Sequence, residues 1–269
     1  MSTSPARSSA AQTPATPAAA APAVSRPAPA ARRIAAHGLY ETRNVLRNGE
    51  QLLVSLILPL LVLIGAHRLD LALSDEALPS IDVITPGVLA LAVMASAFTG
   101  QGIATGFERQ YGVLAYLSTT PLGPTGLILG KALAVLCVVI IQTVVLGGAG
   151  LAMGWSPEPA GVIWLAAVVV LGAAAFTALG LLLAGTVRAE ATLALTNVLW
   201  VLMGAAGGSV FPLNHEGTGT LLLILPSASL GEGVRTATLE GGPALLPMII
   251  LAGWATLAIL AARRWFNWR

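Results

Sequence analysis

Between Asp82 and Glu108 the sequence reads VITPGVLALAVMASAFTGQGIATGF (residues 83–107), without a single charged side chain. An α-helix rises about 1.5 Å per residue, so a run of this length can cross the roughly 30 Å hydrocarbon core of a bilayer. The surface of a water-soluble domain would interrupt such a run with charges. The stretch therefore predicts a membrane-spanning helix.

The composition of the whole chain supports this interpretation. Of its 269 residues, 10% are charged and 56% are hydrophobic, whereas a soluble domain carries about 25% charged residues. The net charge of +2, with no basic stripe, excludes a nucleic-acid-binding surface. The single cysteine, Cys137, excludes disulfides within the chain and cysteine-rich metal sites.

Five other charge-free intervals accompany the first. Together the six are Gln51–His67, Val83–Phe107, Ala132–Pro157, Pro159–Val187, Ala191–His215 and Gly241–Ala262. We therefore expect an all-α polytopic membrane protein with six transmembrane helices. The predicted spans cover about residues 52–72, 84–105, 129–153, 161–186, 192–211 and 243–263.

A seventh apolar stretch, Gly217–Gly231, lies between the fifth and sixth spans. It is too short to cross a bilayer and contains Pro226, yet it is too apolar for a water-exposed loop. It predicts a re-entrant helical insertion over residues 212–240, on the external side.

Positive charges set the orientation of the chain. With both termini in the cytoplasm, every Lys and Arg except Arg68 and Arg235 falls on the cytoplasmic side. This bias obeys the positive-inside rule and predicts a multi-pass protein of the cell membrane with both termini cytoplasmic.

The chain divides into two parts. Residues 1–33 form an Ala/Pro-rich cytoplasmic tail, which we expect to be disordered, and residues 34–269 form the transmembrane domain. Within residues 34–50, Arg43, Arg47 and Glu50 share one helical face, which predicts an amphipathic helix on the membrane surface. The alternative is a simple extension of the first span.

Groups that could perform catalysis do not converge anywhere in the sequence. The three histidines lie far apart, and Gly130–Lys131 is not a phosphate-binding loop, because Ala132 stands where Ser or Thr would bind magnesium. We expect neither an enzyme nor a metal or cofactor site in this chain. Gln142 and Asn197 are the main mid-span polar groups, either as interhelical hydrogen bonds or as substrate ligands. Without an ionisable coupling group in the third or fourth span, energy for transport would come from elsewhere.

The loop between the second and third spans reads GFERQYGVLAYLSTTPLGPTGLILGK, residues 106–131. Tyr111, Leu114 and Leu117 recur at i, i+3 and i+6, and breakers follow from Pro121 onward. The spacing predicts a short amphipathic helix in the cytoplasm, which either rests on lipid or docks onto a partner.

At this loop the sequence resembles the ABC-2 family of ATP-binding-cassette exporter permeases. The resemblance rests on Glu108-Arg109 followed by Gly112-Val113-Leu114, then on Thr120-Pro121-Leu122, and finally on Gly130-Lys131 at the start of the third span. It extends over nearly all of residues 34–269 and includes Pro86–Leu91 at the second span.

The resemblance implies that the loop couples the permease to a separate cytoplasmic ATPase, present in two copies, which would bind ATP and magnesium. The implied contact residues are Glu108, Arg109, Gly112, Leu114, Thr120 and Pro121, with Arg43 and Arg47 beside them. Arg188 and Glu190 would form a second contact, or alternatively a plain ion pair in a loop.

The resemblance also implies a transporter that dimerises with a second copy or with a sister permease. We expect an amphiphilic or apolar cargo to be exported along Met94, Phe98, Leu195, Asn197 and Trp200, although each of these could instead serve packing. Pro212 and Pro226 would belong to an external gate. Two other functions remain open, namely a carrier driven by an ion gradient and a membrane assembly factor without transport activity.

Overall fold

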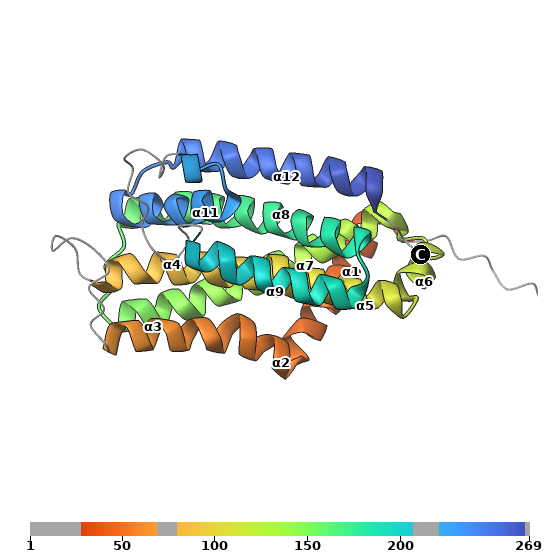
Figure 1. Ribbon diagram of the computed structural model, residues 1–269, viewed down its shortest axis with the longest axis horizontal. Coiled ribbons are helices and arrows are strands. Elements are labelled where there is room, and N and C mark those ends of the chain that lie inside the picture. The colour runs from red at the N-terminus through yellow and green to blue at the C-terminus, as the bar shows by residue number, and fades with distance from the viewer. Residues whose placement is uncertain (1–27, 69–79, 207–220, 267–269) are drawn as a thin grey trace, which may run out of the picture.

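The computed structural model describes residues 28–68, 80–206 and 221–266, and this part of the chain is helical without β-strands. The long helices run side by side along one axis (Figure 1). The predicted all-α class is therefore confirmed for the residues described.

The helices follow one another in a simple order. They are α1 (Ala30–Arg47), α2 (Gly49–Leu52), the π-helix η1 (Leu53–Ile57), α3 (Leu58–Arg68), α4 (Ser80–Met94), the π-helix η2 (Ala95–Gly100), α5 (Gln101–Gln110), α6 (Val113–Ser118), α7 (Gly123–Ala152), the 3₁₀-helix η3 (Pro159–Gly161), α8 (Val162–Thr186), α9 (Ala189–Ala206), α11 (Pro226–Arg235), the π-helix η4 (Thr236–Glu240) and α12 (Leu245–Trp265).

Four continuous helical segments are long and apolar enough to cross a membrane. They are Ile81–Gln110, Thr125–Ala152, Pro159–Thr186 and Leu245–Trp265, and they coincide with the second, third, fourth and sixth predicted spans. Two shorter apolar helices, Ser55–Arg68 and Ala189–Ala205, coincide with the first and fifth. Parts of those two predicted spans lie outside the described residues, so the total of six stays a prediction.

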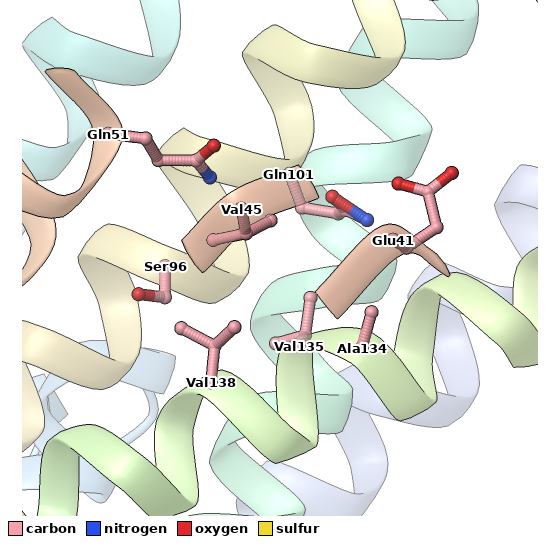
Figure 2. A pocket seen from close by; sticks show the side chains of 8 residues that line it. All are labelled: Glu41, Val45, Gln51, Ser96, Gln101, Ala134, Val135 and Val138. Carbon is pink, nitrogen blue, oxygen red and sulfur yellow. The ribbon is translucent and has the colours of Figure 1, made fainter. Parts of the chain in front are cut away.

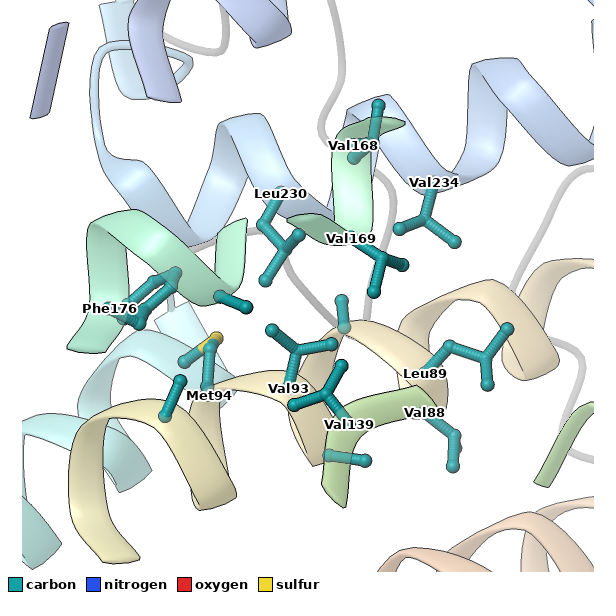
Figure 3. Close-up of a cluster of buried hydrophobic side chains, with 14 of the residues drawn as sticks. Val88, Leu89, Val93, Met94, Val139, Val168, Val169, Phe176, Leu230 and Val234 are labelled. Atoms are coloured by element: carbon teal, nitrogen blue, oxygen red, sulfur yellow. The ribbon is translucent and has the colours of Figure 1, made fainter. Parts of the chain in front are cut away.

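The second span lies at the centre of the bundle. Val88, Leu89, Val93 and Met94 of α4 meet side chains from α7, α8 and α11 in one buried cluster, shown in Figure 3. In lipid, close packing of this kind replaces the hydrophobic effect as the force that holds helices together. α4 is thus enclosed by protein rather than by lipid.

The region predicted as an external re-entrant insertion is described only from residue 221. There α11 begins at Pro226, where proline fits the first turn of a helix, and packs against α4, α8 and α12. With 10 residues it is too short to span a bilayer. Trp254 of α12 donates a hydrogen bond to the carbonyl of Ile224 at 2.8 Å, which ties this insertion to the last span. Its depth in a membrane stays a prediction, and Pro212 lies outside the described residues.

One end of the bundle gathers the segments predicted to be cytoplasmic. α1, α6, the turn between α8 and α9, and the C-terminal end of α12 all lie at this end (Figure 1). The functional site predicted from the sequence therefore occupies one end of the molecule.

Candidate functional site

The loop after the second span is built around two glycines. α5 ends at Gln110, and Gly112 adopts a positive φ of 73°, which favours glycine and breaks the helical path. The predicted short helix is present as α6, which ends before Gly123 with φ 68°. Thr120 closes α6, because its hydroxyl donates to the carbonyl of Leu117 at 2.6 Å.

The two sides of α6 have different roles. Leu114 is fully buried and holds the helix against the bundle, so it is not free to contact a partner. Tyr111 and Tyr116 are 73% and 72% exposed, and Val113 is exposed between them. The predicted apolar face is therefore wrong in one respect, because Tyr111 lies before the break at Gly112 and is exposed, whereas Leu114 is buried. We call Tyr111, Val113 and Tyr116 the α6 patch.

Beneath the loop lies a buried cluster of charges. Lys131, at the start of the third span, is 1% exposed, and its Nζ lies 2.7 Å from Oε2 of Glu108. The same Nζ lies 3.4 Å from Oε1 of Glu41 on α1. Glu108, one of the predicted ATPase contacts, is paired with Lys131 within the chain. The cluster joins α1, α5 and α7, and the sequence analysis missed both Glu41 and this pairing.

His37 completes the cluster. Its Nε2 lies 3.5 Å from Glu41 Oε1, one helical turn away on α1. Burial lowers the pKa of His37 below its ordinary value, because it disfavours the charged form; Glu41 opposes this shift and Lys131 reinforces it.

Glycines bring α1 and α7 into close contact. A Cβ on Gly130 would lie 2.4 Å from Cδ2 of His37, and a Cβ on Gly38 would lie 2.9 Å from Cδ2 of Leu133. Only glycine allows this crossing, so the surface helix is fixed onto the third span. Arg43 and Arg47 lie on the opposite, exposed side of α1.

A second set of bonds links the loop to the turn between α8 and α9. The guanidinium of Arg109 donates to the carbonyl of Val187, and Gln110 Nε2 donates to Oε1 of Glu190 at 2.8 Å. Arg109 and Glu190 therefore stabilise the contact between the loop and the turn, whereas Arg188 is exposed. The two predicted contacts with an ATPase are adjacent in space.

The predicted pathway residues are divided between the core and the surface. Met94 and Phe98 are buried, and the ring of Phe98 packs edge-on against Phe176 at 6.3 Å. Trp200 is half-buried and donates from Nε1 to the carbonyl of Leu91 at 3.4 Å. Leu195 is exposed.

The two mid-span amides also differ. Asn197 lies on the exposed side of α9, and its amide bonds to its own helix at the carbonyl of Leu193. Gln142, by contrast, forms interhelical hydrogen bonds, which is one of the two roles that its sequence position left open. Among the described residues, no three His, Cys, Asp or Glu side chains gather in a way that could hold a metal ion.

Comparison with known proteins identifies one family. A family described as "ABC-2 family transporter protein" matches residues 42–264, which is most of the chain. No curated protein sequence matches the chain.

Proposed function

Because the chain belongs to the ABC-2 family of transporter proteins, we propose that it is the permease subunit of an ABC exporter driven by a separate cytoplasmic ATPase. The family assignment makes the protein a multi-pass membrane transport component. The direction of transport, the ATPase and the residues that meet it are part of the proposal.

The α6 patch is the observation that carries the proposal. Val113 and Tyr116 lie exposed at one end of the bundle, on a helix held in place by the buried Leu114, and the exposed Tyr111 precedes that helix. Exposed aromatic side chains on a rigid support are typical of protein–protein contacts. Arg43, Arg47 and Arg188 are exposed and belong to elements at the same end, which would add positive charge to it.

The Lys131 cluster provides the mechanical link. A displacement of α6 would move α5, which precedes it in the chain. The ion pairs of Lys131 would transmit this displacement from α5 to α1 and α7. Arg109 and Gln110 would transmit it to the turn before α9. ATP would shift the transporter only if the inward-open and outward-open states differ in such contacts.

The transported molecule would be amphiphilic or apolar and would leave through an interface between two permease subunits. α9 supports this proposal, since its exposed side chains include Leu193, Val198, Val201 and Leu202. With six spans, both termini would lie in the cytoplasm, and the region around Pro226 would close the outer end.

Purification of the chain from its native membranes in mild detergent tests the proposal. We expect an ATPase subunit to copurify in equal amount, and the variant Tyr116→Glu with Val113→Asp to lose it while keeping its thermal stability. Glu240→Arg, an exposed charge change outside the loop, is the matched control and should keep the ATPase. If the wild-type chain copurifies with no ATPase, the exporter assignment fails, and flux driven by an ion gradient becomes the leading alternative.

A further inference from the structure

Two π-helical turns lie against each other inside the bundle. η1 (Leu53–Ile57) belongs to the first apolar helix, and η2 (Ala95–Gly100) lies in the middle of the second span. Both are continuous with α-helix on each side. A π turn is uncommon, displaces the usual backbone hydrogen bonds, and occurs most often at functional positions.

Gln142 of α7 bridges the two turns. The side chain of Ser96 in η2 donates to Gln142 Oε1 at 2.9 Å, and Gln142 Nε2 donates to the carbonyl of Ser55 in η1 at 2.8 Å. Gln142 is only 2% exposed, so these bonds form in a medium of low dielectric. A single amide thus connects segments of three spans.

A small cavity with polar and apolar walls adjoins η2, and Figure 2 shows the residues that line it. Its volume is about 10 Å³, room for about one water molecule, and its polar lining is Glu41, Gln51, Ser96 and Gln101. Gln101 follows directly after η2 and is 4% exposed, yet no hydrogen bond joins its side-chain amide to the residues described. Its side chain lines the cavity, so this side of η2 has hydrogen-bonding capacity in reserve.

Gly100 allows Gln51 of α2 to lie close to the end of η2. A Cβ at this position would lie 2.8 Å from Nε2 of Gln51. The amides of Gln51 and Gln101 are therefore near the turn that Gln142 holds from α7.

We propose that Gln142 is a positioning residue for transport, which holds two π turns together at the point where the first and second spans bend during the cycle. The proposal rests on the proposed function and adds the place of bending. When the bonds of Gln142 open, the amides of Gln51 and Gln101, which line the cavity, offer new partners to the turns. Bending then leaves no backbone group unsatisfied within the membrane.

Hydrogen exchange of the full-length chain in lipid nanodiscs, without ATPase, tests the bridge. Gln142→Leu removes both bonds, and we expect residues 53–57 and 95–100 to exchange about tenfold faster, with smaller changes elsewhere. Thr143→Val is the matched control, because the Thr143 hydroxyl bonds only to its own helix at the carbonyl of Val139. It should change exchange in the two turns by less than about twofold. Equal effects of both variants would overturn the proposal.

Ser96→Ala is a milder variant that keeps the test valid if Gln142→Leu fails to fold. It removes one of the two bonds, so exchange should rise at residues 95–100 while residues 53–57 stay near wild type. An equal rise in both turns, or no rise in either, contradicts the bridge.

Addition of ATP to the complete complex tests the role in transport. We expect nucleotide to accelerate exchange in the two turns of the wild type by at least about threefold, and to have no further effect in Gln142→Leu. If exchange in the wild-type turns is the same with and without ATP, Gln142 is only a structural bridge and the proposal is overturned. Failure of the proposed function would differ, because no ATPase would then bind while the exchange pattern of the free chain persisted.

Discussion

The second span and the last span are both apolar helices, but they differ in burial. Other helices of the chain enclose the second span, whereas they cover little of the last span. The most apolar window of Ile81–Gln110 is 100% buried within the chain, whereas that of Leu245–Trp265 is 22% buried. The enclosed span is the more polar of the two: Asp82, Ser96 and Gln101 lie in it and are all buried. A helix that faces lipid must be apolar on its surface, whereas a helix surrounded by protein can carry groups that neighbouring helices satisfy. Burial and hydropathy therefore run in opposite directions here.

The largest loss of stability should follow the removal of a buried charge. Lys131→Met leaves Glu41 and Glu108 facing each other without a cation, and loss of one partner from a buried ion pair costs about 3–5 kcal/mol. We expect a large fall in the thermal unfolding midpoint in detergent. Arg188→Met, an exposed charge at the same end, should change stability by less than about 0.5 kcal/mol.

The carboxylates provide a further check on Lys131. Adding Glu41→Gln and Glu108→Gln to Lys131→Met removes the uncompensated charges, so most of the lost stability should return. If Lys131→Met alone unfolds no earlier than Arg188→Met, the buried cluster does not stabilise the fold.

The next largest difference in stability should separate variants on the two sides of α6. Leu114→Ala removes a fully buried side chain, and such truncations cost about 2–3 kcal/mol at the lower end of their range. Tyr116→Ala removes an exposed ring and should change the unfolding free energy by less than about 0.5 kcal/mol. Both can be measured by thermal unfolding, and similar losses in the two variants would show that α6 is seated differently.

Two glycines compare the packing around the enclosed second span with the exposed surface of the last span. A Cβ on Gly180 of α8 would lie 2.7 Å from the carbonyl oxygen of Phe98, so Gly180→Ala should cost about 1–2 kcal/mol through overpacking. A Cβ on Gly253 of α12 meets nothing within 4 Å, and Gly253→Ala should leave stability unchanged or slightly raised. Thermal unfolding of the pair would sharpen the distinction between the two helices, and a reversed order would break it.

The smallest predicted effect is a dependence of the unfolding midpoint on pH. Because the pKa of His37 is lowered in the folded chain, the unfolded chain takes up this proton first as the pH falls. The contribution of His37 to the stability of the folded chain is complete at a pH above the ordinary pKa of 6.5. It is lost as the pH falls toward the lowered pKa. His37→Gln should flatten the fall of the unfolding midpoint between about pH 7.5 and 5.5, whereas the exposed His67→Gln should not.

Much of this fold can be predicted from the positions of charged residues. Charges rarely enter an apolar bundle, so the charge-free intervals located the apolar helices to within a few residues at most ends. The buried Lys131 could not be found in this way, because its partner Glu41 is 90 residues away and the pairing depends on how α1 crosses α7. The π turns are equally hidden, since no residue pattern in η1 or η2 distinguishes them from ordinary helix.

The loop shows where reasoning from periodicity ends. Tyr111, Leu114 and Leu117 have helical spacing, but Gly112 turns the chain between the first two, so the spacing no longer describes one face. The exposed pair Val113 and Tyr116 has the same i, i+3 spacing within α6 itself. Location of the helix boundary at Gly112 would have identified the correct side.

The two glycines that bound α6 make this helix an exchangeable unit. The short helix Val113–Ser118 lies between these glycines, and Leu114 is its buried residue. Selection could therefore rewrite the outward side chains of α6 while the transmembrane bundle stays as it is. Under the proposed function, duplicated permeases would diverge in the ATPase they accept sooner than in the molecule they carry, and we would expect a graft of residues 113–118 to transfer that choice from one permease to another.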